Sequence, residues 1–231
     1  MYHLVAVTGM SPQVITETLY AMNRDGDAWP DRITIITTAK GRDTVWKGLQ
    51  VDGHLAALCR ELGRPQLSFT QDDIKVVPGA DGTLVEDARS REDHEAMANF
   101  ITDRIRELTA DDQVRLHASI AGGRKTMTFY LGYAMSLFGR HDDKLTHVLV
   151  SEPFENRRDF YYPTRESHLL ALRDGETAPV DARDAEVILA DIPFVRQRNQ
   201  LPRVMREKLG SGFSYRRLMN LINLADIPEK I

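Results

Sequence analysis

Short apolar runs alternate with longer segments of helical periodicity over the first 150 residues of the chain. The runs are rich in β-branched residues and end at glycine or polar residues, a pattern that favours buried strands. We predict strands at residues 3–8, 33–38, 114–120 and 145–150. Apolar residues recur at helical spacing between these runs, which predicts helices around residues 15–22, 51–62, 97–108 and 125–138.

Strands that alternate with helices at this spacing are typical of βαβ units. We therefore predict an α/β fold, in which a Rossmann-like, mainly parallel sheet carries helices on both faces, over residues 1–163. Residues 164–231 are expected to form a C-terminal extension that packs on this core and ends in a short helix near residues 215–224. A hairpin is predicted at residues 154–163, and residues 67–77 are expected to be extended and irregular.

The composition limits the partners that the protein can have. A formal net charge of -4 disfavours broad binding to duplex DNA, which needs a basic surface, but allows a small anionic ligand in a local basic pocket. The single cysteine, Cys59, excludes an intrachain disulfide and is typical of a reducing compartment. Neither a signal peptide nor a run of about 18 apolar residues is present, so we expect a cytoplasmic protein without a membrane segment.

Ligands of doubly wound sheets usually bind at the carboxyl ends of the strands, in the loops that enter the helices. This rule selects the loops at residues 8–12 and 121–125. In the second loop, Gly122 and Gly123 let the backbone approach an anion, and the following helix N-terminus attracts negative charge. Arg124 and Lys125 add two positive charges, which favours phosphate, although an ordinary turn with solvated cations also accounts for these residues.

The familiar nucleotide-binding motifs do not match either loop. A Walker A loop needs G-x-x-x-x-G-K-[ST], whereas Arg124 separates Gly123 from Lys125, and no G-x-G-x-x-G follows the first strand. In the first loop, Ser11 is well placed to cap the helix that begins at Pro12 and to offer a hydroxyl to a ligand. The polar residues 16–18 further along this helix are explained by a surface position.

Two segments, VTGMSPQVITETLYAM at residues 7–22 and SIAGGRKTMTFYLGYAMSLFG at residues 119–139, together with HVLVSEPFE at 147–155, resemble the CRISPR-associated Rossmann-fold (CARF) family. They are most similar to its ring nucleases and to the ligand-sensing domains of type III CRISPR effector nucleases. The resemblance covers roughly residues 1–163, and DIPFVRQR at 191–198 also resembles the family. It implies a homodimer that binds cyclic tetra-adenylate, or alternatively cyclic hexa-adenylate, across its two-fold axis.

The resemblance also implies the site. Ser11 and Lys125 match the serine and lysine implicated in catalysis by such ring nucleases. The ligand-binding residues are expected to be Thr8, Gly9, Met10, Gln13, Gly122, Gly123, Arg124, Thr126, Arg196 and Arg198. For the two tail arginines, closure over the ligand and exposure to solvent are equally supported. No metal and no cofactor are expected.

The implied reaction is the attack of a ribose 2′-OH on its own 3′-phosphate, which leaves a 2′,3′-cyclic phosphate end. The protein then needs to align the ring and to stabilise charge on the phosphoryl oxygens, and Ser11 and Lys125 suit these two tasks. A metal site built from His141, Asp142, Asp143 and His147 is disfavoured, because these residues fit structural or solvent roles.

Three other functions compete with the ring nuclease. A sensor domain that controls a nuclease would carry an R-x-x-x-x-H motif, and Arg89 to His94 fits this spelling but lies at the start of a core helix. A DNA-binding regulator needs a winged-helix domain, for which the tail is short. A non-catalytic sensor or sponge that only binds cyclic oligoadenylate needs the same pocket, so the sequence does not separate it from a slow enzyme.

Overall fold

The computed structural model describes residues 1–79, 81–175, 178–200 and 214–225. The strands of these ranges are β1 (Tyr2–Val7), β2 (Arg32–Thr37), β3 (Ile74–Val76), β4 (Arg115–Ser119), β5 (Lys144–Val150) and β6 (Val187–Asp191). The helices are α1 (Gln13–Arg24), α2 (Ala39–Trp46), α3 (His54–Leu62), α4 (Arg91–Ala110), α5 (Lys125–Phe138) and α7 (Tyr215–Ala225). A π-helical turn (Lys47–Val51) follows α2, and 3₁₀ turns lie at Gln71–Asp73 and Ala182–Asp184.

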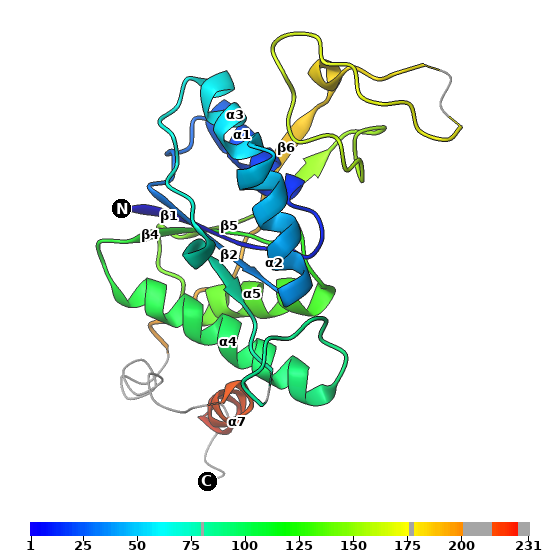
Figure 1. Ribbon diagram of the computed structural model, residues 1–231. Coiled ribbons are helices and arrows are strands. Elements are labelled where there is room, and N and C mark those ends of the chain that lie inside the picture. The colour runs from blue at the N-terminus through cyan, green and yellow to red at the C-terminus, as the bar shows by residue number, and fades with distance from the viewer. Residues whose placement is uncertain (80, 176–177, 201–213, 226–231) are drawn as a thin grey trace.

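Within the described ranges, the six strands form one sheet in the order β3-β2-β1-β4-β5-β6. All neighbouring pairs are parallel except β5 and β6, which are antiparallel. Figure 1 shows α1, α2 and α3 on one face of the sheet, and α4 and α5 on the other. The predicted Rossmann-like fold is therefore confirmed, with the reversal of strand order lying between β1 and β4.

Each face of the sheet has its own hydrophobic core, because successive side chains of a strand point to opposite faces. In β1, Leu4 and Ala6 join the core under α1, α2 and α3. Val5 and Val7 join the core under α4 and α5. All four are at most 1% exposed. Burial on both faces explains why β1 has a continuous apolar sequence rather than an alternating one.

Three elements lie outside the sequence prediction, namely helix α2 and strands β3 and β6. Helix α2 has only Gly41 and Val45 fully buried, so the segment carries too few apolar positions to reveal its period. Strand β3 lies in the segment expected to be irregular and has three residues. The predicted hairpin at 154–163 is wrong, because residues 151–163 form turns and irregular structure with no strand. Phe154 and Phe160 instead anchor this segment in a small core against α1 and β5.

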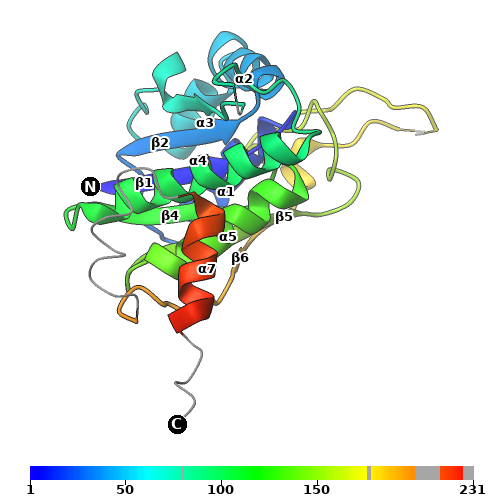
Figure 2. The ribbon, with the colours of Figure 1, turned by 90° about the horizontal axis from the view of Figure 1, so that it is seen from below.

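The C-terminal extension contributes strand β6 to the main sheet, where it pairs with β5. Thr146 lies opposite Asp191 at one end of this pairing, and Val150 lies opposite Val187 at the other. The predicted terminal helix corresponds to α7, which lies against α4 on the outer side of the helical layer (Figure 2). Leu218 of α7 is buried in the core of that layer. Residues 201–213 of this extension lie outside the described residues. Among the described helices, none combines the length and the apolar character that crossing a membrane requires.

Candidate functional site

The two loops selected from the sequence meet at the switch between β1 and β4. A Cβ atom on Gly9 would lie 3.8 Å from the Gly123 Cα, and one on Gly122 would lie 3.1 Å from Thr8 Oγ1. The Thr8 hydroxyl donates to the Ser11 carbonyl at 2.8 Å, which closes the first loop. Since β1 and β4 are adjacent and parallel, their carboxyl ends bring these loops together. The predicted common edge is confirmed.

A third loop that was not singled out from the sequence joins this edge. Thr38 caps α2 by accepting from the Gly41 backbone N–H at 3.3 Å. A Cβ atom on Gly41 would lie 2.7 Å from the Gly9 carbonyl oxygen, so glycine is needed where α2 passes the first loop. The N-termini of α1, α2 and α5 therefore lie at the same edge, where their dipoles favour a negatively charged ligand.

Ser11 does not cap α1, which corrects the sequence expectation. Pro12 already has helical dihedrals (φ -63°, ψ -21°) and is the N-cap residue, and no side chain caps this helix. Ser11 therefore stands one residue before the cap, and its side chain is exposed and lines a cavity next to the loops. The hydroxyl is placed to contact a ligand there.

The cavity has a volume of about 470 Å³ and lies between α1, the glycine loop, β5 and the segment after β5. Four of the predicted site residues line it: Ser11, Gln13, Gly122 and Gly123. Thr8, Gly9, Met10, Arg124, Lys125 and Thr126 are not part of its lining. Thr8 is buried, whereas Met10 is 46% exposed beside α2 and accepts a weak hydrogen bond from Thr44.

The two cations of the glycine loop lie at the start of α5, beside the cavity. Arg124 is the N-cap residue of α5 and pairs with Asp87 from the segment before α4. Lys125 is the first residue of the helix, is exposed, and its ammonium has no side-chain partner within the described ranges. Thr126 turns instead toward Met97 of α4. Lys125 is therefore the loop cation that is available to an external anion.

One family model, described as CRISPR-associated protein NE0113, matches residues 11–223. The chain belongs to this family of CRISPR-associated proteins. The match spans both Ser11 and the glycine loop with Lys125, and it confirms the CRISPR association that the sequence resemblance implied. A comparison with curated proteins returned no match.

In this family member, the structure does not bring Arg196 and Arg198 to the loops. Arg196 donates to the carbonyls of Arg140 and Asp143 at 2.9 Å each and lies over the Phe194 ring. Arg198 donates to the carbonyls of Thr109 and Phe138, at 2.9 and 3.0 Å. These carbonyls belong to the C-terminal ends of α4 and α5 and to the turn that follows α5. They lie at the opposite edge of the sheet, where such groups lack helical partners.

Glu17 is a cavity residue that was not selected from the sequence. Thr16 and Thr18 are fully buried and donate to backbone carbonyls, and Glu17 is only 8% exposed, so these are not surface positions. Burial, with a smaller contribution from the negative charge of Glu155, raises the pKa of the Glu17 carboxyl to about 8. The signal in the sequence is the spacing of four between Gln13 and Glu17, which places both on one face of α1.

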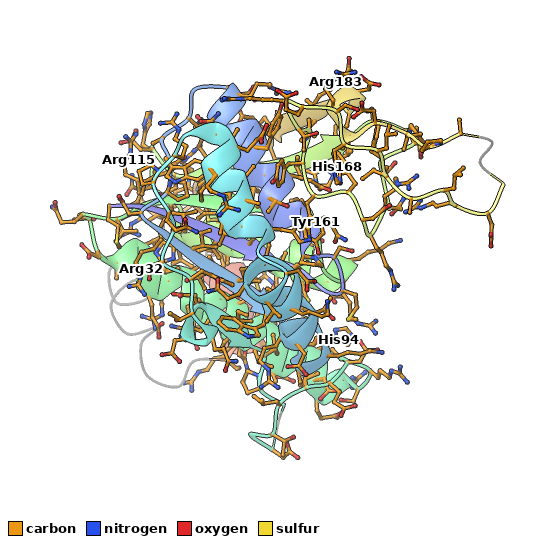
Figure 3. All side chains as sticks on the ribbon, turned by 45° about the horizontal axis from the view of Figure 1, so that its top comes forward. Arg32, His94, Arg115, Tyr161, His168 and Arg183 are labelled. Atoms are coloured by element: carbon orange, nitrogen blue, oxygen red, sulfur yellow. The ribbon has the colours of Figure 1, made fainter. Side chains whose placement is uncertain are left out.

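The segment after β5 forms the outer wall of the cavity. Arg157 is 3% exposed and forms an ion pair with Asp159 at 3.0 Å, which holds the turn. Tyr161 stacks on His54 of α3 with ring centroids 3.5 Å apart, so packing accounts for the position of this ring. Figure 3 shows Tyr161 beside the helices of the α1–α3 layer.

The other motifs considered from the sequence lie elsewhere. His94 is on α4, across the sheet from Tyr161 (Figure 3), and Arg89 pairs with Asp87. Asp143 is buried and accepts from the Leu116 backbone N–H, which is a structural role. No group of three or more His, Cys, Asp or Glu side chains that could hold a metal ion occurs among the described residues.

Proposed function

We propose that the protein is a ring nuclease that binds cyclic tetra-adenylate at the interface of a homodimer and cleaves it without a metal. The observation that carries the proposal is the contact between the Gly9 and Gly123 loops, since it joins the two motifs that resemble the ring nucleases of the CARF family. The match to a CRISPR-associated family over residues 11–223 supports the same assignment. Cleavage of the ring would switch off type III CRISPR signalling.

The chemistry requires little more than alignment and charge stabilisation. The 2′-oxygen of one ribose forms a bond to its own 3′-phosphorus, the bond to the leaving 5′-oxygen breaks, and the 2′-OH proton ends on that 5′-oxygen. The Ser11 hydroxyl is suited to orienting the 2′-OH or a phosphoryl oxygen. The exposed Lys125 ammonium and the α5 N-terminus are suited to stabilising the charge that grows on the phosphoryl oxygens.

The cavity of one protomer suits part of such a ring. Its volume of about 470 Å³ is in the range of sites for single small molecules. A four-nucleotide ring is larger and is itself symmetric. Two copies of the chain, each contributing one cavity and one glycine loop, would give the ring a matching two-fold site.

Incubation of the purified protein with cyclic tetra-adenylate in EDTA tests the proposal. We expect linear products with 2′,3′-cyclic phosphate ends, and a loss of about 100- to 1000-fold in rate for Lys125→Ala, as is usual for a single preorganised donor. Lys47→Ala is the matched control, because Lys47 is exposed and pairs with Asp52 on the π-helical turn. Full turnover by Lys125→Ala would exclude this residue from the catalytic site.

A binding-only sensor or sponge is the second candidate function. The pairing of Arg124 with Asp87 favours it, since one of the two cations expected to stabilise the reaction is already neutralised. Stoichiometric binding of the ring with no linear product would establish this function in place of the nuclease.

A further inference from the structure

Two polar side chains of α1 line the cavity with unused hydrogen-bonding capacity. Gln13 is 6% exposed, and its amide nitrogen donates to the Arg158 carbonyl at 2.8 Å. The Gln13 Oε1 atom is buried and has no partner in the described part of the chain. The Glu17 carboxyl belongs to a residue that lines the same cavity, and no hydrogen bond or ion pair joins it to another described residue. An unpaired polar atom shut off from water is unfavourable, so a ligand that offers a donor to Gln13 Oε1 and a hydrogen-bonding partner to Glu17 would be stabilised in this cavity.

The two groups differ in hydrogen-bonding character. Gln13 Oε1 can only accept, as any amide oxygen does, and the bond from the amide nitrogen to the Arg158 carbonyl fixes the orientation of the amide group. Since the pKa of Glu17 is raised to about 8, its carboxyl is largely neutral at pH 7 and can donate a hydrogen bond. A spacing of four residues places them on the same face of the helix, with their Cβ atoms about 6 Å apart. The cavity therefore presents an acceptor next to a donor.

Gly122 and Gly123 line the same cavity, so a phosphate held at the glycine loop would bring its nucleoside toward α1. Adenine carries an exocyclic amino donor beside a ring-nitrogen acceptor, which complements an acceptor–donor pair. We propose that Gln13 and Glu17 form a subsite that reads adenine, with Gln13 Oε1 accepting from the amino group and the neutral Glu17 carboxyl donating to the adjacent ring nitrogen. This inference rests on the proposed function, which supplies the nucleotide, and assigns base specificity to α1.

Deprotonation of Glu17 removes the donor and places a negative charge beside the base, so binding falls as the pH rises. The other charged or titratable side chains that line the cavity are His147 of β5, and Glu155, Arg157 and Arg158 of the segment after β5. Glu155 is the neighbour whose charge raises the Glu17 pKa. The Glu155→Gln variant removes this charge and so lowers the Glu17 pKa. The pH at which binding falls should then be lower than in the wild type. The His147→Gln variant should keep the pH dependence, because the imidazole is not the group responsible.

The experiment is calorimetric titration of cyclic tetra-adenylate and of adenosine 5′-monophosphate into the full chain between pH 6 and pH 9. For the wild-type protein, we expect affinity to be constant at low pH and to fall by about 10-fold per pH unit above the Glu17 pKa. Glu17→Gln, which keeps a neutral donor, should bind without this pH dependence, and Glu17→Ala should bind about 10- to 100-fold more weakly at pH 7. Glu92→Gln, an exposed glutamate of α4, is the control.

The outcomes separate the two proposals. If the ring binds but Glu17→Gln keeps the wild-type pH profile, the subsite is wrong and the proposed function stands. If the monophosphate binds with the expected Glu17 dependence but the ring does not bind, the subsite stands and the proposed function fails. If neither ligand binds at any pH, both are wrong. Should Glu17→Ala fail to fold, the pH profile of Glu17→Gln still decides.

Discussion

The Arg124 guanidinium donates two hydrogen bonds to a single carboxylate oxygen of Asp87. The second Asp87 oxygen accepts from Arg89 at 3.1 Å. Hydrogen bonds from Arg124 and then Arg89 hold the pKa of Asp87 below its ordinary value, so the carboxylate stays charged and offsets the Arg124 charge. The segment before α4 therefore reduces the positive potential of the glycine loop.

Replacement of Asp87 by Asn should release Arg124 and strengthen binding of cyclic tetra-adenylate several-fold. The freed cation adds one more phosphate contact, so the slope of log K against log salt concentration should steepen by about 0.7, as for single-stranded nucleic acid. Affinities measured at several salt concentrations check this. Asp112→Asn, an exposed position, is the control. An unchanged slope would mean that Arg124 does not reach the ligand.

A side chain at Gly122 should crowd the contact between the two loops. A Cβ atom there would lie 3.1 Å from both Thr8 Oγ1 and Val14 Cγ2, and 3.2 Å from the Val7 carbonyl oxygen, which is backbone and cannot rotate away. We expect Gly122→Ala to lose about 1–3 kcal/mol of stability through overpacking, and to weaken ring binding by at least about 10-fold because the loops separate. Thermal unfolding and ligand titration measure the two effects.

The matched control for this variant is Gly132→Ala in the middle of α5. Among the described residues, a Cβ atom at Gly132 would meet Leu145 Cδ2 alone, at an ordinary 3.8 Å. The helical preference of alanine over glycine should then stabilise the protein by up to about 1 kcal/mol. Equal losses of ring affinity in the two variants would contradict a specific role for the loop contact.

Glu17 should make the folded protein less stable as the pH rises. Its pKa is about 8 in the folded chain, against an ordinary value of 4.5, so between these values only the folded state keeps the proton. The free energy of unfolding then falls by about 1.4 kcal/mol per pH unit. Glu17→Gln removes this effect, and its advantage over the wild type should grow between pH 5 and pH 8. Denaturant unfolding at several pH values checks this, and a constant difference between the two proteins would contradict it.

Arg198 should stabilise the fold without binding the ring. Its Nη1 atom donates to the carbonyls of Thr109 and Phe138 at the ends of α4 and α5. Loss of such charged hydrogen bonds costs about 1.5–3 kcal/mol. We expect Arg198→Ala to unfold several degrees lower and to bind cyclic tetra-adenylate within about two-fold of the wild type. A large loss of affinity with an unchanged unfolding temperature would restore this arginine to the ligand site.

The sequence was sufficient for the features that depend on neighbouring residues. Apolar runs and helical spacing predicted β1, β2, β4 and β5 and the boundaries of α5, because burial on a sheet imposes a local period. Alternation of strands and helices then predicted a parallel sheet, and with it the meeting of the loops at Gly9 and Gly123.

Only the tertiary structure decided which polar side chains serve the site. The irregular segment after β5 packs on the part of α1 that carries Glu17, since Gln13 and Thr16 donate to the carbonyls of Arg158 and Tyr161. Irregular segments carry no period from which such burial can be predicted. Arg124 meets Asp87 across 37 positions of the chain, and Arg198 reaches Thr109 across 89. Local patterns determine where strands, helices and turns form, whereas the environment of an ionisable group is set by residues that folding brings from distant parts of the chain.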